Sequence, residues 1–178
     1  MNFKQSLIDK FSSEERIGIQ NLCHWTGLTE EEFGREHPGE EFNGEAVLPD
    51  GRNLAICTNG ADYVVKTLGE GARYGFFVDK NPTVMDSEII ATGGHDFAVI
   101  RNRFIVDLWI SHFTGCEKQV VFDLWDKKDH SKIKELYGDP SCWSCYVAAT
   151  DKVYDPHEIP DSLKVALGPK RNDPGLCP

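Results

Sequence analysis

The clearest pattern of apolar and polar positions lies in residues 93–109, which read GGHDFAVIRNRFIVDLW. β-Branched and aromatic residues fill two short runs, separated by a polar tripeptide at 101–103. Runs of this composition are typical of β-strands, and a short polar break between two of them is typical of a hairpin loop. The pattern therefore predicts two antiparallel strands joined by a three-residue loop, with Ile100 opposite Phe104.

This predicted register brings two polar side chains together at the open end of the hairpin. Phe97 falls opposite Asp107, and His95 shares a strand face with Phe97. His95 and Asp107 are then diagonal neighbours, roughly 7–8 Å apart at the backbone, which lets an imidazole meet a carboxylate. A two-residue loop would shift the pairing by one residue and put the two side chains on opposite faces. The prediction therefore depends on the length of the loop.

A helix is predicted upstream of the hairpin, over Cys57–Leu68, where it would end at Gly69. Its inward positions would be Val64, Val65 and Leu68. A thiol at a helix N-terminus and near an imidazolium ionises more readily than a free thiol. Cys57 is therefore a candidate nucleophile, with His95 as its base and Asp107 as the group that orients the imidazole.

Patterns elsewhere predict the rest of an α+β fold, in which N-terminal helices pack on an antiparallel sheet. Further strands are expected over residues 73–79, 116–126 and 143–149. Helices are expected from a capping box at Ser12 and Glu15, over residues 30–36, and as a turn over residues 133–137. Residues 87–91 fit either a strand or a helical turn. The expected organisation is a single domain over residues 1–178, with a helical preface (1–36), a core (53–126) and a loop-rich tail (150–178).

The composition agrees with one folded domain that carries a net negative charge. Hydrophobic residues make up 40% of the 178 residues, which is enough for a buried core. The formal net charge of −10 disfavours nucleic acid and anionic membranes as partners. The N-terminus lacks the apolar run of a signal peptide, and no stretch approaches the ~18 apolar residues of a membrane span. Cytoplasmic synthesis is expected, and export without a cleavable signal stays open.

The order of the three candidate residues adds a family resemblance. A cysteine that starts a helix, a histidine on a following strand and an aspartate on the next strand resemble the papain-like and transglutaminase-like superfamily. The segments HDFAVI and FIVDLW are similar to the histidine strand and the aspartate strand of that core. The resemblance covers residues 53–109 and implies thiol catalysis at an amide or ester carbonyl by Cys57, His95 and Asp107. No cofactor and no metal are expected.

Polar and aromatic residues beside this predicted triad are candidates for substrate binding. The Cys57 N–H is the natural first donor to an oxyanion. The resemblance implies a second donor from an upstream side chain, for which Asn53 is the available amide. Thr58 and Asn59 follow the thiol and could line the site. Trp109, at the end of the aspartate strand, is a further candidate.

Two features leave alternatives open. Asp123 lies in a similar segment, VVFDLW, and is a rival to Asp107 as the orienting acid. Cys142 and Cys145 form a CxxC that could be two thiols, a disulfide (within the pair or to Cys177) or half of a metal site. Buried or incidental thiols are favoured, because no second pair of ligands accompanies the CxxC.

The sequence thus favours a thiol hydrolase that acts on a protein or peptide, such as a cysteine peptidase, an amidase or a glutamine deamidase. A role as an effector or toxin, with a protein inhibitor or immunity partner, would fit this activity. An acyltransferase or transglutaminase would use the same triad and differ in the group that resolves the thioester. The alternative from another class is a non-enzymatic acidic binding or immunity-type protein, in which Cys57 is a core thiol and His95 and Asp107 are structural.

Overall fold

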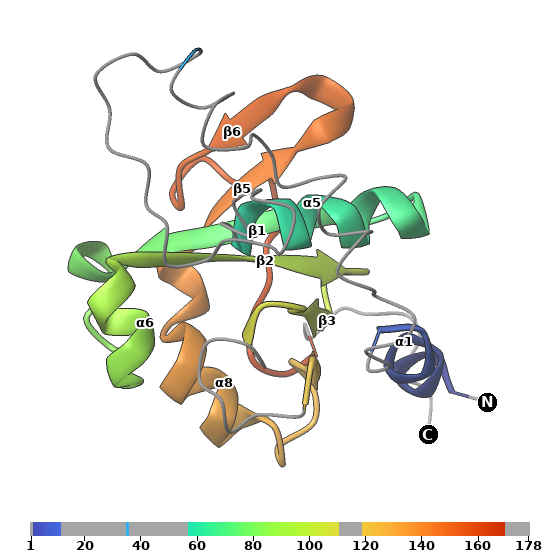
Figure 1. Ribbon diagram of the computed structural model, residues 1–178, viewed down its shortest axis with the longest axis horizontal. Coiled ribbons are helices and arrows are strands. Elements are labelled where there is room, and N and C mark those ends of the chain that lie inside the picture. Colours follow the sequence, from blue (N-terminus) through green and yellow to red (C-terminus); the bar gives the residue numbers. More distant parts are fainter. Residues whose placement is uncertain (1, 12–34, 36–56, 111–118, 170–178) are drawn as a thin grey trace.

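The computed structural model describes residues 2–11, 35, 57–110 and 119–169 (Figure 1). Its helices are α1 (Phe3–Phe11), α5 (Cys57–Leu68), α6 (Ser87–Thr92) and α8 (His130–Tyr137). Its strands are β1 (Ala72–Phe77), β2 (Gly94–Ile100), β3 (Phe104–Val106), β4 (Val121–Asp123), β5 (Ser144–Val147) and β6 (Lys152–Tyr154). Short 3-10 turns are η2 (Val78–Lys80), η3 (Pro140–Cys142) and η4 (Ala148–Thr150). No helix in this part of the chain is long and apolar enough to span a membrane.

Within the described residues, six antiparallel strands form one sheet in the order β4-β3-β2-β1-β5-β6. Helices cover both of its faces, with α1 and α5 on one side and α6 and α8 on the other (Figure 1). The chain therefore has an α+β fold with an antiparallel sheet, as the sequence patterns predict.

Strand β2 lies near the middle of the sheet and contributes to both apolar clusters, because neighbouring side chains of a strand point to opposite faces. Ala98 and Ile100 pack with α1 and α5, whereas Phe97 packs with α6 and α8. His95 has the parity of Phe97 and faces the α8 side, whereas Asp96 faces α5. Two polar residues next to each other in the sequence therefore serve opposite faces of the sheet.

The β2–β3 hairpin has the predicted register. Ile100 pairs with Phe104, and the loop contains three residues. Arg101 and Asn102 have φ angles of 54° and 52°, and the Arg103 N–H donates to the Ile100 carbonyl at 3.1 Å. Two successive left-handed residues give a turn whose twist matches that of the paired strands. The loop length on which the side-chain pairing depends is therefore the one observed.

The other predicted strands are present but shorter than expected. β1 ends at Phe77, which pairs with Gly94 at the very start of β2, and η2 follows at once. The described part of β4 pairs only over the three residues of β3. β5 ends at Val147, where η4 and the left-handed Asp151 turn the chain into β6.

Residues 87–91, which fit a strand or a helical turn, lie in the helix α6. The Asp86 carboxylate caps this helix by accepting the N–H groups of Glu88 and Ile89, each at 3.0 Å. Gly93 ends the helix with a φ of 77°, a left-handed conformation that glycine adopts without a Cβ clash. The helix therefore ends one residue before β2, and this sets where His95 enters the sheet.

Both ends of the described chain contain structure that the sequence patterns missed. Leu7 and Phe11 of α1 are buried in the same cluster as α5, and the Asn2 side chain accepts the Gln5 N–H at the start of α1. The loop-rich tail contains β6, and Ile159 packs in the cluster on the α8 side. The helices predicted from Ser12 and over residues 30–36 fall outside the described residues, except for Arg35.

Candidate active site

The centre of the candidate site is a buried pair formed by His95 and Asp107. The His95 Nε2 and Asp107 Oδ2 atoms are 2.6 Å apart, and the two residues are 4% and 2% exposed. The last β2–β3 pair is Ala98 with Val106, so β2 continues beyond the end of β3. His95 lies in this extension, and Asp107 is the first residue after β3. The hairpin therefore brings together the imidazole and the carboxylate that the sequence singles out.

Asp107 is held by donors from three parts of the chain. Its Oδ1 atom accepts the backbone N–H groups of Trp109 and Ile110 at 3.0 and 3.1 Å. Its Oδ2 atom faces His95 and also accepts the Tyr137 hydroxyl at 2.9 Å. Both carboxylate oxygens are thus engaged by donors, which fixes the orientation of the carboxylate.

Tyr137 is a component of the site that the sequence analysis missed. It is fully buried at the C-terminal end of α8, and its ring stacks on His95 with the ring centroids 6.1 Å apart. Its carbonyl accepts the Trp143 indole N–H at 2.7 Å and the Asn81 amide at 2.9 Å. A buried tyrosine at a helix end is also an ordinary core residue, so no local sequence signal connects it with Asp107.

The charge of Asp107 controls the protonation of His95. Burial disfavours the imidazolium, but the Asp107 carboxylate, its hydrogen bond and the contact with Cys57 together raise the pKa of His95 to about 10. His95 is therefore protonated at neutral pH. Since Nε2 is occupied by Asp107, Nδ1 is the ring nitrogen that remains for the Cys57 side chain.

Cys57 is the first residue of α5 and reaches His95 from that position. Its side chain is hydrogen-bonded to His95, and its thiol is free and half-buried. The first turn of α5 packs beside the segment that follows Asp107. A Cβ atom built at Gly60 would lie 3.9 Å from the Cβ atom of Leu108. The structure thus places Cys57, His95 and Asp107 in one continuous arrangement.

The other predicted site residues have different positions. The Thr58 hydroxyl donates to the Asp96 carboxylate at 2.7 Å, on the α5 side of β2. Trp109 is half-buried, and its backbone N–H binds Asp107. Asn59 lies in the first turn of α5, and only its backbone is described. Asn53 lies outside the described residues.

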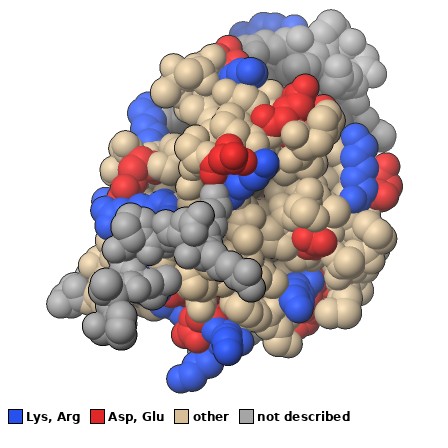
Figure 2. All heavy atoms as spheres, turned by 180° about the vertical axis from the view of Figure 1, so that it is seen from behind, with Lys and Arg blue, Asp and Glu red and all other residues tan. Residues whose placement is uncertain are grey.

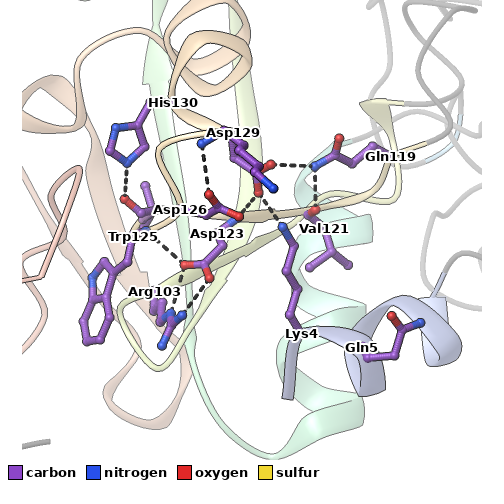
Figure 3. A network of polar contacts seen from close by, with 12 residues as sticks. Lys4, Gln5, Arg103, Gln119, Val121, Asp123, Trp125, Asp126, Asp129 and His130 are labelled. Carbon is purple, nitrogen blue, oxygen red and sulfur yellow. Dashed lines mark hydrogen bonds and ion pairs between the residues drawn. The ribbon is translucent and has the colours of Figure 1, made fainter. Parts of the chain in front are cut away.

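Asp123, the rival orienting acid, has another partner. Its carboxylate accepts two parallel hydrogen bonds from Arg103, at 2.9 and 2.8 Å, and a third from the Trp125 N–H (Figure 3). Burial tends to raise the pKa of Asp123, but Arg103 and the Trp125 N–H outweigh this effect and lower it. Of the two acids, Asp107 is therefore the one that contacts His95.

The described residues show no metal centre. They contain no group of three or more His, Cys, Asp or Glu side chains arranged to hold an ion. Cys142 and Cys145 of the CxxC are free thiols, and Cys145 is buried in β5. Burial raises the pKa of the Cys145 thiol, which makes it a poor nucleophile.

The charges on the surface are mixed. Figure 2 shows Lys and Arg side chains interspersed with Asp and Glu over one face of the molecule, without a continuous area of one sign among the residues described there.

No protein-family model, no curated protein and no solved structure matches this chain. Any assignment of function therefore depends on the geometry of the site.

Proposed function

We propose that the protein is a thiol hydrolase that acts on an amide or ester carbonyl, with Cys57 as nucleophile, His95 as acid and base, and Asp107 as the orienting carboxylate. The observation that carries this proposal is the buried 2.6 Å contact between His95 and Asp107, with Cys57 hydrogen-bonded to the same imidazole. A buried charged pair is costly to fold unless its groups are well paired, and a cysteine at a helix start beside it has the setting of a reactive thiol.

The order of the elements supports a papain-like or transglutaminase-like core. The nucleophile begins a helix, the histidine follows on β2, and the aspartate follows directly after β3. Asp107 is hydrogen-bonded to Nε2 of the imidazole and leaves Nδ1 for the thiol, so the ring has one nitrogen for each partner. This division of roles is what a cysteine–histidine–acid triad requires.

The proposed reaction has two stages. In the first, the Cys57 sulfur forms a bond to the carbonyl carbon while His95 gives its proton to the leaving amine or alcohol, whose bond to that carbon breaks. In the second, a water molecule loses a proton to His95 while its oxygen forms a bond to the thioester carbon, and the carbon–sulfur bond breaks. The carboxylic acid is released, and Cys57 is left as a thiolate beside the protonated His95. Asp107 keeps the imidazole oriented and stabilises its charged form in both stages.

Oxyanion stabilisation is proposed to come from the start of α5. The first N–H groups of an α-helix have no acceptor within the helix, and the helix dipole places positive charge there. The backbone N–H of Cys57 stands at this position, beside the carbon that its own sulfur would attack. A protein or peptide is the proposed substrate, and an amine in place of water would make the same triad a transferase.

The pH dependence of alkylation by iodoacetamide tests whether Cys57 is activated. We expect Cys57 to react at about pH 6 faster than Cys142, the other half-buried free thiol of the described chain, because its side chain is hydrogen-bonded to the His95 imidazole. The His95→Ala variant should lose this advantage. Mass spectrometry of tryptic peptides assigns each label to its cysteine. Equal rates for the two thiols in the folded protein would refute the proposal.

A second experiment tests the acyl step itself. The protein is mixed with p-nitrophenyl acetate, quenched in acid and examined by intact mass and peptide mapping. We expect an acetyl group on Cys57 that decays by hydrolysis in the wild type and does not form in Cys57→Ser or His95→Ala. A Cys142→Ser variant is the matched control, and it should acylate as the wild type does.

A further inference from the structure

A second contact joins α5 to β2 one position further along both elements. Thr58, the residue after Cys57, donates its hydroxyl proton to Oδ2 of Asp96, the residue after His95, at 2.7 Å. Because His95 and Asp96 are neighbours in a strand, their side chains point to opposite faces of the sheet. The start of α5 is therefore held from both sides of β2, by Cys57 on the His95 side and by Thr58 on the Asp96 side.

Asp96 is itself held in place by Arg73 of β1. The Arg73 Nη1 atom donates to the same Oδ2 atom of Asp96 at 2.8 Å, and its Nε atom donates to Asp62 at 3.0 Å. Asp62 lies one helical turn after Thr58, on the same face of α5. The Arg73 guanidinium also lies over the Tyr146 ring, 4.5 Å from its centroid. Arg73 therefore links the helix to β1 and β2, and it orients the carboxylate that receives Thr58.

The sheet makes room for this carboxylate at Gly75. Gly75 pairs with Asp96, and a Cβ at Gly75 would lie 1.8 Å from Asp96 Oδ1 and 3.0 Å from its Cγ. Any side chain at this position would displace Asp96. The absence of a Cβ thus allows the carboxylate to lie flat on β1, where Arg73 and Thr58 reach it.

From these contacts we infer that Thr58 and Asp96 are positioning residues for the nucleophile: their hydrogen bond sets the distance and direction between the Cys57 sulfur and the His95 imidazole. The inference rests on the proposed function, because it concerns the same triad, and it replaces the substrate-binding role that the sequence suggests for Thr58. Asp96 and Thr58 touch no reacting atom in this scheme. They act through the backbone of α5 and β2.

Such a link matters because the triad joins two separate elements. His95 and Asp107 belong to one hairpin and are fixed by its register, whereas Cys57 comes from a helix that could slide or tilt on the sheet. Displacement of a reacting group by about 1 Å can reduce a rate about a hundredfold. The hydrogen bond between Thr58 and Asp96, one residue away from the nucleophile, restrains this movement.

The test compares Thr58→Val with Thr58→Ser. Valine keeps the shape and removes the hydroxyl, whereas serine keeps the hydroxyl. Thr67→Val, near the other end of α5 and exposed, is the matched control. For each variant, the rate of Cys57 alkylation by iodoacetamide is measured from about pH 5 to about pH 10, together with urea unfolding, and Thr58→Ala serves in place of valine if that variant does not fold.

We expect Thr58→Val to lose at least about tenfold in rate near pH 6, where reaction requires His95, and to approach the wild-type rate at high pH, where the free thiolate reacts unaided. Thr58→Ser should stay near the wild type, and Thr67→Val should match it. A Thr58→Val profile that equals the wild-type profile would overturn the inference. If the wild type itself shows no His95-dependent reaction near pH 6, the proposed function fails, and that result is separate from any effect of Thr58.

Discussion

The same three residues stand at the ends of two neighbouring strands of the sheet, and their aspartates have different surroundings. The sequence Asp-Leu-Trp follows β3 at Asp107 and begins at the last residue of β4 at Asp123. In both copies the aspartate accepts the backbone N–H of the tryptophan two residues later, at 3.0 Å for Asp107 and 2.9 Å for Asp123. The contact between the aspartate side chain and the tryptophan N–H is therefore the same in both places.

The partners across the sheet make the difference. Asp107 meets His95 and Tyr137, both buried, and shares their apolar surroundings. Asp123 meets Arg103, whose side chain is 37% exposed. Arg103 also lies over the Trp125 ring, at 4.6 Å from its centroid. The guanidinium that pairs with Asp123 therefore also stacks on Trp125, at the surface.

A further acid, Asp129, stabilises the Asp-Leu-Trp segment at Asp123. Asp129 accepts the backbone N–H of Asp123 and the ammonium group of Lys4, each at 2.7 Å (Figure 3). This contact ties α1 to β4 and to the start of α8. The comparison shows that a local sequence can fix a turn and a buried acceptor, while the residue that faces the acceptor decides whether it supports chemistry or holds elements together.

The most direct test of the difference between Asp107 and Asp123 is to replace each aspartate by asparagine, which removes its charge. In Asp107→Asn the amide NH₂ must face either the Trp109 and Ile110 N–H groups or His95 and Tyr137, because donors occupy both oxygens. We expect the alkylation of Cys57 near neutral pH to fall roughly a hundredfold or more, since the imidazole loses its orientation and its charge partner.

Asp123→Asn is the matched control for this experiment. It should leave the alkylation rate within about twofold of wild type and lower the free energy of unfolding by about 1 kcal/mol, because its ion pair is partly exposed. Alkylation rates and urea unfolding of both variants are measured side by side. A loss of Cys57 reactivity in Asp123→Asn equal to that in Asp107→Asn would remove the distinction between the two acids.

The pH dependence of stability should differ in sign between the two pairs. His95 has a folded pKa of about 10, raised from 6.5, so its contribution to stability is complete below pH 6.5 and is lost as the pH rises to about 10. Asp123 has a folded pKa below 3.8, so its contribution is present above pH 3.8 and is lost as the pH falls below that value.

Urea unfolding across this pH range measures both contributions. His95→Gln should flatten the alkaline decline and leave the acid decline, whereas Asp123→Asn should weaken the acid decline and leave the alkaline one. An unchanged alkaline decline in His95→Gln would show that another group causes it.

The sequence predicted those parts of the site that depend on local pattern. The hairpin register follows from the spacing of apolar residues about the loop, and with it the meeting of His95 and Asp107. The start of α5 at Cys57 and its end at Leu68 follow from amphipathic spacing and Gly69. These features involve neighbours along the chain or strands joined by three residues, so short-range rules are sufficient for them.

The missed parts depend on contacts across long stretches of chain. Tyr137 lies 30 residues from Asp107, and Thr58 lies 38 residues from Asp96. Nothing in the sequence around either residue marks it as a partner, because any buried tyrosine or helix-start threonine fits many folds. Of the two rival acids, Asp107 is the one in contact with His95, whereas Arg103 binds Asp123.

Smaller effects on Cys57 reactivity than that of Asp107→Asn are expected when a hydrogen-bond donor to each acid is changed. Tyr137→Phe removes one hydrogen bond to Asp107 Oδ2 and leaves His95 in contact with the same oxygen. A hydrogen bond to a charged group contributes about 2 kcal/mol, so the free energy of unfolding should fall by about that amount. The alkylation rate should fall only about threefold to tenfold, because the imidazole keeps its partner and loses only part of the restraint on it.

Arg103→Lys is the corresponding change at the second acid. Lysine keeps the charge but loses one of the two parallel N–H bonds to Asp123 and the stacking on Trp125, at a cost of about 0.5–1 kcal/mol. Cys57 reactivity should be unchanged, because Asp123 has no contact with His95. A Tyr137→Phe variant that loses stability but keeps the full alkylation rate would make Tyr137 a packing residue. Asp107 would then orient His95 through the hairpin and the turn at Trp109, and α8 would only cover the pair.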